Sequence, residues 1–358
     1  MKFALSRTLL VFAAIVPVIN AGPIDFSLTT LATNTTDPQL VNPWGIAASA
    51  TSPMWLGDNG TGLSEIYSGA GVKNASLVVT IPGDGSVTGV AFSGSAGNFN
   101  GDSFLFVSED GTVSGWRTAL GTTAETLVSG STSNVYKGLT MDSTGGDLYA
   151  LAANFRNDSI DVLKGNPADP NLAGTFTDPS LPAGYAPFDV QDIGGVVYVT
   201  YAEQDPSKHD EVDGAGLGYV DAYDQNGNLL GRLVSNGVLN APWGLAIAPA
   251  GFGNLAGDLL VGNFGDGTIS AFTTSGAYVE TLDGTNGNPL SISGLWALHF
   301  GSGSANGGGV DTLYVTAGPN GETGGLFAEI NAVPEPSTWL FVGMGLAGAM
   351  GLRRAKRV

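Results

Sequence analysis

Carboxylate, amide and indole side chains recur along this chain next to glycine-rich turns. Three tryptophans and Asp189 stand where apolar stretches open, and the other acids and amides follow short strand-like segments. Oxygen ligands beside an aromatic surface can bind a divalent cation such as Ca²⁺ or the face of a sugar. The candidate ligand-binding residues are Trp44, Asp58, Asn59, Glu109, Asn154, Asp189, Trp243, Asn263, Asp266 and Trp296.

Each of these residues also has a purely structural interpretation. Asp-Asn-Gly and Asp-Gly are ordinary hairpin turns, because these residues tolerate a positive φ where the chain reverses. The longest polar insertion, residues 203–213, carries several acids and His209, and it fits either a Ca²⁺-binding loop or a solvated turn. His299 lies in the apolar stretch 295–300 and is expected in the core.

The composition excludes several kinds of chemistry. The chain has 358 residues, no Cys and two His, so thiol catalysis and Cys-ligated metals are ruled out. Residues 22–332 hold 7 basic and 31 acidic residues, a net charge of −24. Nucleic acid is not an expected partner, because a phosphate backbone is bound through Lys and Arg. No nucleophile–base signature is found, and no cofactor is predicted; Ca²⁺ is the ion that an oxygen-rich site would accept.

Short strands separated by Gly, Asn and Asp turns indicate an all-β fold built from repeats. The 55 glycines disfavour helix. Periods of about 50 residues with several strands each are typical of a β-propeller. We therefore predict a six-bladed β-propeller with four-stranded antiparallel blades over residues 22–332. The six aligned strand openings, spaced 44 to 55 residues apart, are at Gly45, Gly89, Gly138, Asp189, Gly244 and Ala297.

The two ends of the repeat region are expected to meet in one blade. The sixth unit has three recognisable strands, and a strand-like stretch at 24–33 precedes the first opening. Using 24–33 as the outer strand of the sixth blade completes the ring and covers an open edge. A pair of β-sandwiches is the alternative fold, but it does not account for six openings.

Two sequence patterns resemble those of NHL-type six-bladed propellers. Pro-Trp-Gly occurs at 43–45 and 242–244, and Gly-Asp-Gly-Thr-Ile-Ser-Ala-Phe occupies 265–272. The whole chain resembles a family of propellers that carry a PEP-CTERM tail and have no assigned chemistry.

Residues 1–21 have the three parts of a secretory signal peptide. Lys2 and Arg7 come before an apolar run at 8–19, and small residues follow at 21 and 22. The apolar run is too short to span a membrane. We expect cleavage after Ala21.

Residues 333–358 resemble a PEP-CTERM sorting tail. Pro334, Glu335 and Pro336 form the motif, residues 338–352 carry no charge, and a basic cluster follows at 353–357. A basic cluster after an apolar helix stays cytoplasmic and leaves the preceding chain outside. The resemblance implies a short hydrophobic helix in the inner membrane, processing by an exosortase, and transfer to the outer surface or matrix of a Gram-negative, exopolysaccharide-producing bacterium. A plain C-terminal membrane anchor is the alternative.

Three hypotheses of function follow. In a propeller, the connection that opens each inner strand and the hairpin after each second strand reach one face, so the candidate residues are expected around one mouth. The first hypothesis is a non-enzymatic surface or matrix module that binds exopolysaccharide or surface proteins. The second, suggested by similar propellers, is a metal-dependent lactonase or lyase, and the third is a purely structural surface protein. The metal ligands of the second hypothesis would be Glu109, Asn154, Asp189 and Asn263, with Asp266 as the base.

Overall fold

The computed structural model describes residues 24–333. The expected signal peptide, with its cleavage site at Ala21, lies outside these residues. So does the tail from Pro334 onward, which holds Glu335, Pro336 and the expected hydrophobic helix. Among the described residues, no helix is both long and apolar enough to cross a membrane.

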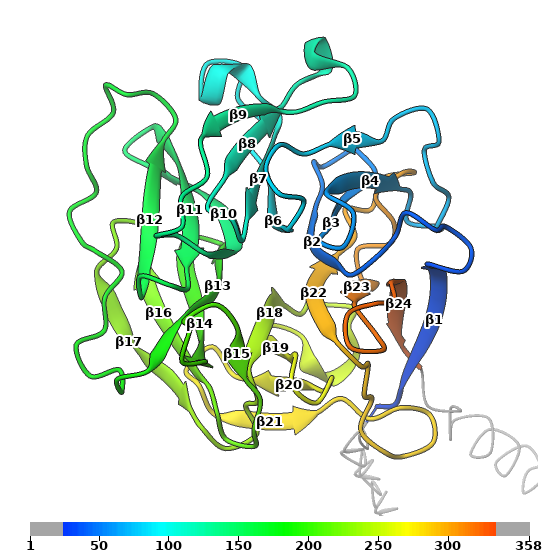
Figure 1. The fold of residues 1–358 in the computed structure, drawn as a ribbon. Helices are drawn as coiled ribbons and strands as arrows, with labels where there is room; N and C mark the ends of the chain where they lie inside the picture. Colours follow the sequence, from blue (N-terminus) through cyan, green and yellow to red (C-terminus); the bar gives the residue numbers. More distant parts are fainter. Residues whose placement is uncertain (1–23, 334–358) are drawn as a thin grey trace, which may run out of the picture.

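The described chain forms six antiparallel β-sheets arranged around a central axis (Figure 1). From the axis outward, the first three sheets are β2 (Pro43–Ala47), β3 (Met54–Asp58), β4 (Leu63–Tyr67) and β5 (Val79–Thr80); β6 (Val87–Phe92), β7 (Phe104–Ser108), β8 (Val113–Trp116) and β9 (Glu125–Val128); and β10 (Tyr136–Thr144), β11 (Asp147–Asn154) and β12 (Ser159–Lys164). The other three are β13 (Tyr185–Ile193), β14 (Val196–Gln204), β16 (Tyr219–Asp224) and β17 (Leu229–Ser235), with β15 (Glu211–Val212) beside β14; β18 (Pro242–Ile247), β19 (Leu259–Asn263), β20 (Ile269–Phe272) and β21 (Tyr278–Thr281); and β22 (Leu295–Phe300), β23 (Leu313–Ala317), β24 (Leu326–Ala332) and β1 (Phe26–Thr33). Short 3-10 helices lie in the connections at Phe99–Gly101, Thr118–Leu120 and Gly253–Leu255.

The innermost strands of neighbouring blades pack tightly against one another around the axis. Each carries a β-bulge near its first residues, as between Pro43 and Ile46 in β2. A Cβ atom on Gly45 would lie 2.7 Å from the carbonyl oxygen of Thr88 in the next inner strand. A Cβ atom on Gly244 would lie 2.5 Å from the carbonyl oxygen of Trp296. The small residues that align in the sequence are therefore required by the close approach of backbones.

The six blades are confirmed, and two of them depart from four strands. The third sheet has three strands, and the fourth gains β15. After β12, the chain crosses to the fourth blade, where the backbone N–H groups of Gly174 and Phe176 donate to the carbonyls of Asn226 and Gly227 at 2.7 and 3.0 Å. The Phe176 ring is buried there, 5.7 Å from the ring of Tyr223. The segment after β12 therefore bonds to the fourth blade and adds no fourth strand to the third.

Strand β1 closes the sixth blade, as the sequence predicts. It pairs antiparallel with β24, with Leu28 opposite Ile330 and Ala32 opposite Phe327. Phe26 is fully buried, with its ring 5.0 Å from the ring of Phe252 in the fifth blade. The first strand therefore packs against two blades.

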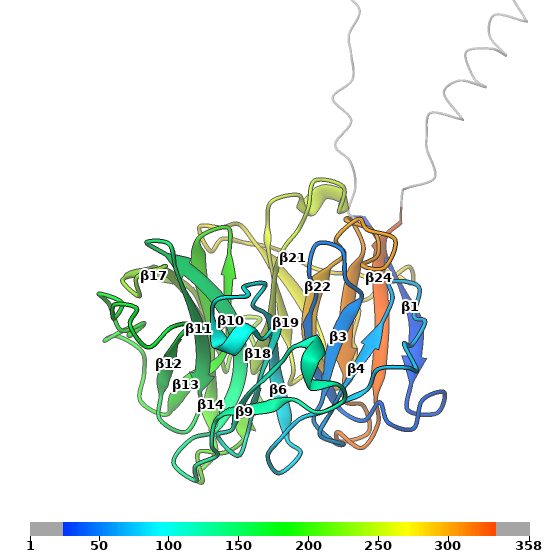
Figure 2. The same cartoon turned by 90° about the horizontal axis from the view of Figure 1, so that it is seen from above.

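The described ends of the chain lie at one face of the propeller. Strand β24 begins after the hairpin at 318–325 and ends at Ala332, and the antiparallel register places Phe26 opposite Ala332. Figure 2 shows β1 and β24 side by side in the side-on view. The hairpin at 318–325 therefore lies at one face of the propeller. The two ends of the described chain, near Phe26 and Ala332, lie at the opposite face.

Candidate functional site: an acidic pocket at the propeller mouth

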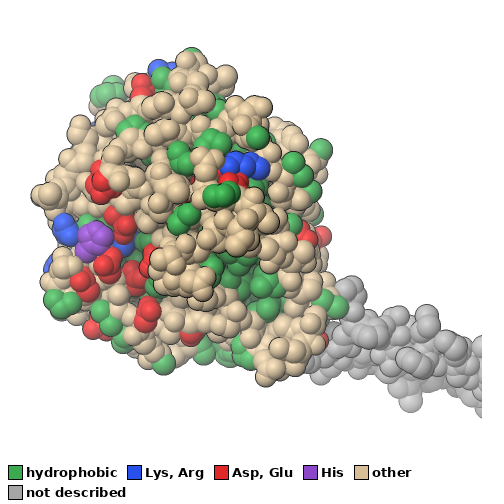
Figure 3. Space-filling view, turned by 45° about the vertical axis from the view of Figure 1, so that its right-hand side comes forward, with side chains coloured by type: hydrophobic (Ala, Val, Ile, Leu, Met, Phe, Trp, Pro, Cys, Tyr) green, Lys and Arg blue, Asp and Glu red, His purple; other side chains and the backbone are tan. Residues whose placement is uncertain are grey.

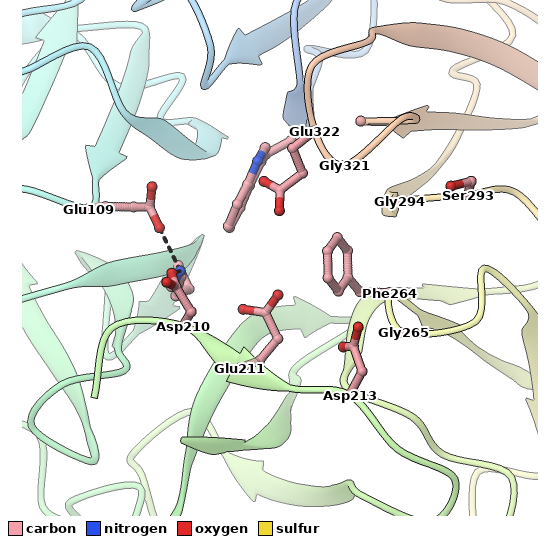
Figure 4. Close-up of a pocket in the computed structure, with 13 residues that line it drawn as sticks. Glu109, Asp210, Glu211, Asp213, Phe264, Gly265, Ser293, Gly294, Gly321 and Glu322 are labelled. Atoms are coloured by element: carbon pink, nitrogen blue, oxygen red, sulfur yellow. Dashed lines mark hydrogen bonds and ion pairs between the residues drawn. The ribbon is translucent and has the colours of Figure 1, made fainter. Parts of the chain in front are cut away.

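A cavity of about 480 Å³ lies at one end of the propeller axis (Figure 4). It is formed by the openings of inner strands and by the hairpins after second strands, which is the mouth that propeller geometry predicts. All six blades or their connections contribute to its wall. The lining residues are Trp44, Glu109, Lys137, Asp210, Glu211, Asp213, Phe264, Gly265, Ser293, Gly294, Gly318, Gly321 and Glu322.

Aromatic rings fill the axis beneath the cavity. The ring of Trp296 is stacked between Trp44, at 3.5 Å, and Phe264, at 4.1 Å. Trp243 and Phe188 meet Trp296 edge-on, at 5.9 and 6.0 Å. The mouth is therefore a blind pocket with an aromatic floor, and a separate cavity of about 30 Å³ lies on the far side of these rings.

One buried lysine stands in the pocket wall. Lys137 is 1% exposed, and its Nζ donates to Oε1 of Glu109 at 2.5 Å. Asp210 lies 3.7 Å from the same nitrogen, and the Trp44 ring centroid lies 5.1 Å away. Burial acts to lower the pKa of Lys137, but the surrounding carboxylates outweigh it and the net pKa is raised. The lysine is therefore an ammonium ion that partly balances the acids around it.

The polar insertion 203–213 contributes to the pocket wall, although its tip at 206–208 is exposed to solvent. Strand β15 pairs with β14, with Gln204 opposite Glu211, and the Asp205 carboxylate accepts the backbone N–H of His209 at 2.8 Å. This loop supplies three of the pocket acids, Asp210, Glu211 and Asp213. In Figure 4 the carboxylates of Glu211 and Asp213 point into the cavity.

Burial and mutual repulsion raise the pKa values of three pocket acids, Glu211, Asp213 and Glu322. Burial, with Glu322 and Asp213 nearby, raises the pKa of Glu211 to about 7, although Lys137 acts in the opposite direction. Burial also raises the pKa of Glu322, against the hydrogen bond from Asn42, and burial with Asp266 raises that of Asp213. More negative charge faces this cavity than its single lysine can neutralise. Figure 3 shows acidic side chains gathered around a histidine on the molecular surface.

A line of amides holds two of these acids in place. The Nδ2 of Asn42 donates to Glu322 at 2.7 Å and to Asn59 at 3.3 Å, and Nδ2 of Asn59 donates to Glu109 at 3.0 Å. The Oδ1 of Asn42 accepts the indole N–H of Trp296 at 3.0 Å. The acids on opposite sides of the pocket are thus joined to its aromatic floor.

Sequence comparison places the chain among known relatives. An uncharacterized protein of Acanthamoeba polyphaga mimivirus is 35% identical, over 74% of this chain and 69% of the viral protein. A second uncharacterized protein of the same virus is 33% identical, over 73% of this chain and 74% of its own length. The chain belongs to their family.

This family member also carries a sorting signal and shares its fold with a solved structure. Residues 332–356 match the PEP-CTERM protein-sorting motif, which marks an exported protein directed to the cell surface. A protein of unknown function from Bacteroides thetaiotaomicron matches with a TM-score of 0.52 and 14% identity, over 86% of this chain and 72% of that chain. At this identity the match shows a common fold.

The candidate residues from the sequence divide into two groups. Trp44 and Glu109 line the pocket, Asn59 supports Glu109, and Trp296 and Trp243 form part of the floor. The remaining five lie away from the cavity lining: Asp58, Asn154, Asp189, Asn263 and Asp266.

Three of those five hold turns together. Asn154 donates to Asp161 at 2.9 Å, Asn263 donates to Thr268 at 3.1 Å, and Asp266 accepts the backbone N–H of Thr268 at 3.0 Å. Their structural interpretation as turn residues agrees with these bonds.

The other two are buried carboxyls, Asp58 and Asp189. Burial raises the pKa of each well above its ordinary value. Asp189 lines the 30 Å³ cavity below the aromatic floor, together with Trp243 and His299. The set Glu109, Asn154, Asp189 and Asn263 does not converge on one point.

Lys137 and Glu211 are two of the pocket residues that are absent from the candidate set. Lys137 aligns with Trp44, Trp243 and Trp296, one residue before the small residue of each strand opening. A lysine in a position that is aromatic in four of the other five openings was the available signal. Glu211 was named only as part of a polar insertion, and its place over the pocket depends on the pairing of β15 with β14.

Within the described chain, the atoms of Glu109, His209 and Asp210 come close enough to hold a metal ion, within 4.8 Å of one another. Both oxygens of Glu109 are already engaged, one by Lys137 and the other by Asn59. A cation placed there would face the Lys137 ammonium. The Ca²⁺ ion considered from the sequence therefore fits these three residues poorly.

Proposed function

We propose that this protein is an exported, non-enzymatic binding module that presents its acidic pocket away from the surface to which its tail directs it. The partner we propose is exopolysaccharide on the outer surface or in the matrix of a Gram-negative bacterium. An exosortase would process the tail after a transient stay in the inner membrane. The observation that carries the proposal is the position of the pocket relative to the chain ends.

The sixth blade links the pocket to the sorting tail. The hairpin before β24 contributes Gly318, Gly321 and Glu322 to the pocket, and β24 then runs to Ala332 at the opposite face. The PEP-CTERM match begins at residue 332, where this strand ends. A tail that attaches the chain from that face would leave the pocket open to the exterior.

The pocket lining supports binding rather than covalent chemistry. Ser293 is the one residue of the pocket lining that carries a hydroxyl group. No basic side chain in the described chain forms a hydrogen bond with this hydroxyl, so it is not activated as a nucleophile. Lys137 is held as an ammonium ion, which lacks the lone pair of a nucleophile. The metal-dependent lactonase or lyase hypothesis would have to use Glu109, His209 and Asp210, where Lys137 competes with the ion.

Co-sedimentation tests the proposal. The purified full chain is incubated with exopolysaccharide isolated from the bacterium that produces the protein, and bound polysaccharide is measured after washing. We expect retention by the wild type and by Asp147→Asn, whose carboxyl lies at the start of β11, away from the pocket. We expect reduced retention by Glu322→Gln. No retention by the wild type, or equal retention by all three proteins, would contradict the proposal.

A further inference from the structure

We infer that the pocket binds a primary ammonium group carried on a body of sugar size, such as an amino sugar unit. The inference rests on the proposed function, because it assigns a ligand to the same pocket. Three features of the pocket support it: unpaired carboxylates, their spacing, and the aromatic lining.

Three carboxylates face the cavity without a cationic partner. Glu109 and Asp210 form ion pairs with Lys137, whereas Glu211, Asp213 and Glu322 form none with any residue of the described chain. Figure 4 shows Glu211, Asp213 and Glu322 around the same open space as Phe264. Acids that repel one another around an enclosed space would be stabilised by a positively charged ligand.

The spacing of these acids favours an organic cation over a metal ion. A Ca²⁺ ion needs six to eight oxygens at about 2.3–2.6 Å, so its ligands must crowd around one point. Among the described residues, the set of acids and histidine that approaches within 4.8 Å is Glu109, His209 and Asp210. Glu211, Asp213 and Glu322 are not part of such a set. They line a cavity of about 480 Å³, within the range of sites for small organic ligands.

The aromatic lining also favours an organic cation over a metal ion. Lys137 already places its ammonium 5.1 Å from the Trp44 ring centroid, so this ring accepts a cation nearby. Phe264 is half-buried and offers a second ring to the cavity.

Calorimetric titration of the full chain tests the inference. The probes are glucosamine, N-acetylglucosamine and glucose, which have similar size, and only glucosamine carries an ammonium group. We expect glucosamine to bind at least about tenfold more tightly than either uncharged sugar, a difference of about 1.4 kcal/mol. Glu211→Gln and Glu322→Gln should each weaken glucosamine binding about tenfold, because each removes one charge from the pocket. The control Asp147→Asn should bind like the wild type.

Each outcome bears on the inference. Equal binding of glucosamine and N-acetylglucosamine by the wild type, a comparison that needs no variant, would overturn it. Displacement of glucosamine by CaCl₂ at micromolar concentration would also overturn it, because the acids would then belong to a metal site. If exopolysaccharide is retained but glucosamine is not bound, the inference fails and the proposed function stands. If glucosamine is bound but exopolysaccharide is not retained, the ammonium site stands and the proposed function fails.

Discussion

The Nζ atom of Lys137 lies 2.5 Å from Oε1 of Glu109 and 5.1 Å from the ring centroid of Trp44. These three side chains come from the third, second and first blades. The lysine is 1% exposed, so the contact is shielded from water on nearly every side. Lys137 therefore links three blades at the mouth and supplies the one Lys or Arg charge in the pocket lining.

Removing the lysine should strongly destabilise the fold. Lys137→Met leaves the Glu109 carboxylate without its charged partner, and breaking a buried pair in this way costs about 3–5 kcal/mol. Adding Glu109→Gln to Lys137→Met should recover part of the loss, because the unpaired charge is then removed. Urea unfolding measures both effects, with Lys164→Met on β12 as the control, because Lys164 forms no ion pair with any residue of the described chain. Strictly additive changes in the free energy of unfolding would contradict the coupling.

Glu211 should make stability depend on pH near neutrality. Its pKa is raised from 4.5 to about 7 by burial and by Glu322 and Asp213, against the opposing effect of Lys137. The folded state therefore holds this proton more tightly than the unfolded state. That contribution is full below pH 4.5 and is lost as the pH rises through 7.

The variant Glu211→Gln lacks this titration. Relative to the wild type, it should gain up to about 3 kcal/mol in unfolding free energy between pH 4.5 and pH 8. Urea unfolding at several pH values measures the difference, and Asp147→Asn should parallel the wild type throughout. A constant difference between Glu211→Gln and the wild type across this range would contradict the prediction.

Local sequence patterns predicted most of the fold. Gly45 and Gly244 are glycine because neighbouring backbones leave no room for a Cβ atom, so the same constraint recurs in both blades and is visible in the sequence. Strand β1 was predictable because 24–33 had no place in the first unit. The three-stranded third blade was not predictable, because the segment after β12 makes its hydrogen bonds and its Phe176–Tyr223 ring contact with the fourth blade.

The pocket was less accessible to sequence reasoning than the fold. The face was predictable from propeller connectivity, and Trp44 and Glu109 were identified on it. Asn154, Asn263 and Asp266 have the same residue types in the same kind of turn, yet their side chains bond to that turn and to the adjoining connection. Sequence spacing cannot tell a side chain that bonds inward from one that reaches the axis. Glu211 reaches the pocket because a long insertion pairs with β14, which only the folded structure determines.

The closing strand should contribute to stability mainly through Phe26. This side chain is fully buried and its ring lies 5.0 Å from Phe252, so Phe26→Ala should cost about 3–5 kcal/mol. Leu28 lies two residues further along the same strand and is 38% exposed, so Leu28→Ala should cost less than about 1.5 kcal/mol. Both variants keep the backbone pairing of β1 with β24. Equal midpoints of urea unfolding for the two variants would show that the strand adds stability through its backbone alone.

The junction between the third and fourth blades should not tolerate a methyl group at residue 138. A Cβ atom there would lie 2.1 Å from Oδ1 and 2.7 Å from Cα of Asp189, and the second of these is a backbone atom that cannot rotate away. Gly138→Ala should therefore separate the inner strands β10 and β13 and cost about 1–3 kcal/mol. Gly97→Ala is the matched control, because a Cβ atom at Gly97 meets no atom within 4 Å. Adding Asp189→Gly should relieve part of the clash in Gly138→Ala. Thermal unfolding of the three variants tests this, and a Gly138→Ala protein as stable as Gly97→Ala would mean that the blades can move apart at little cost.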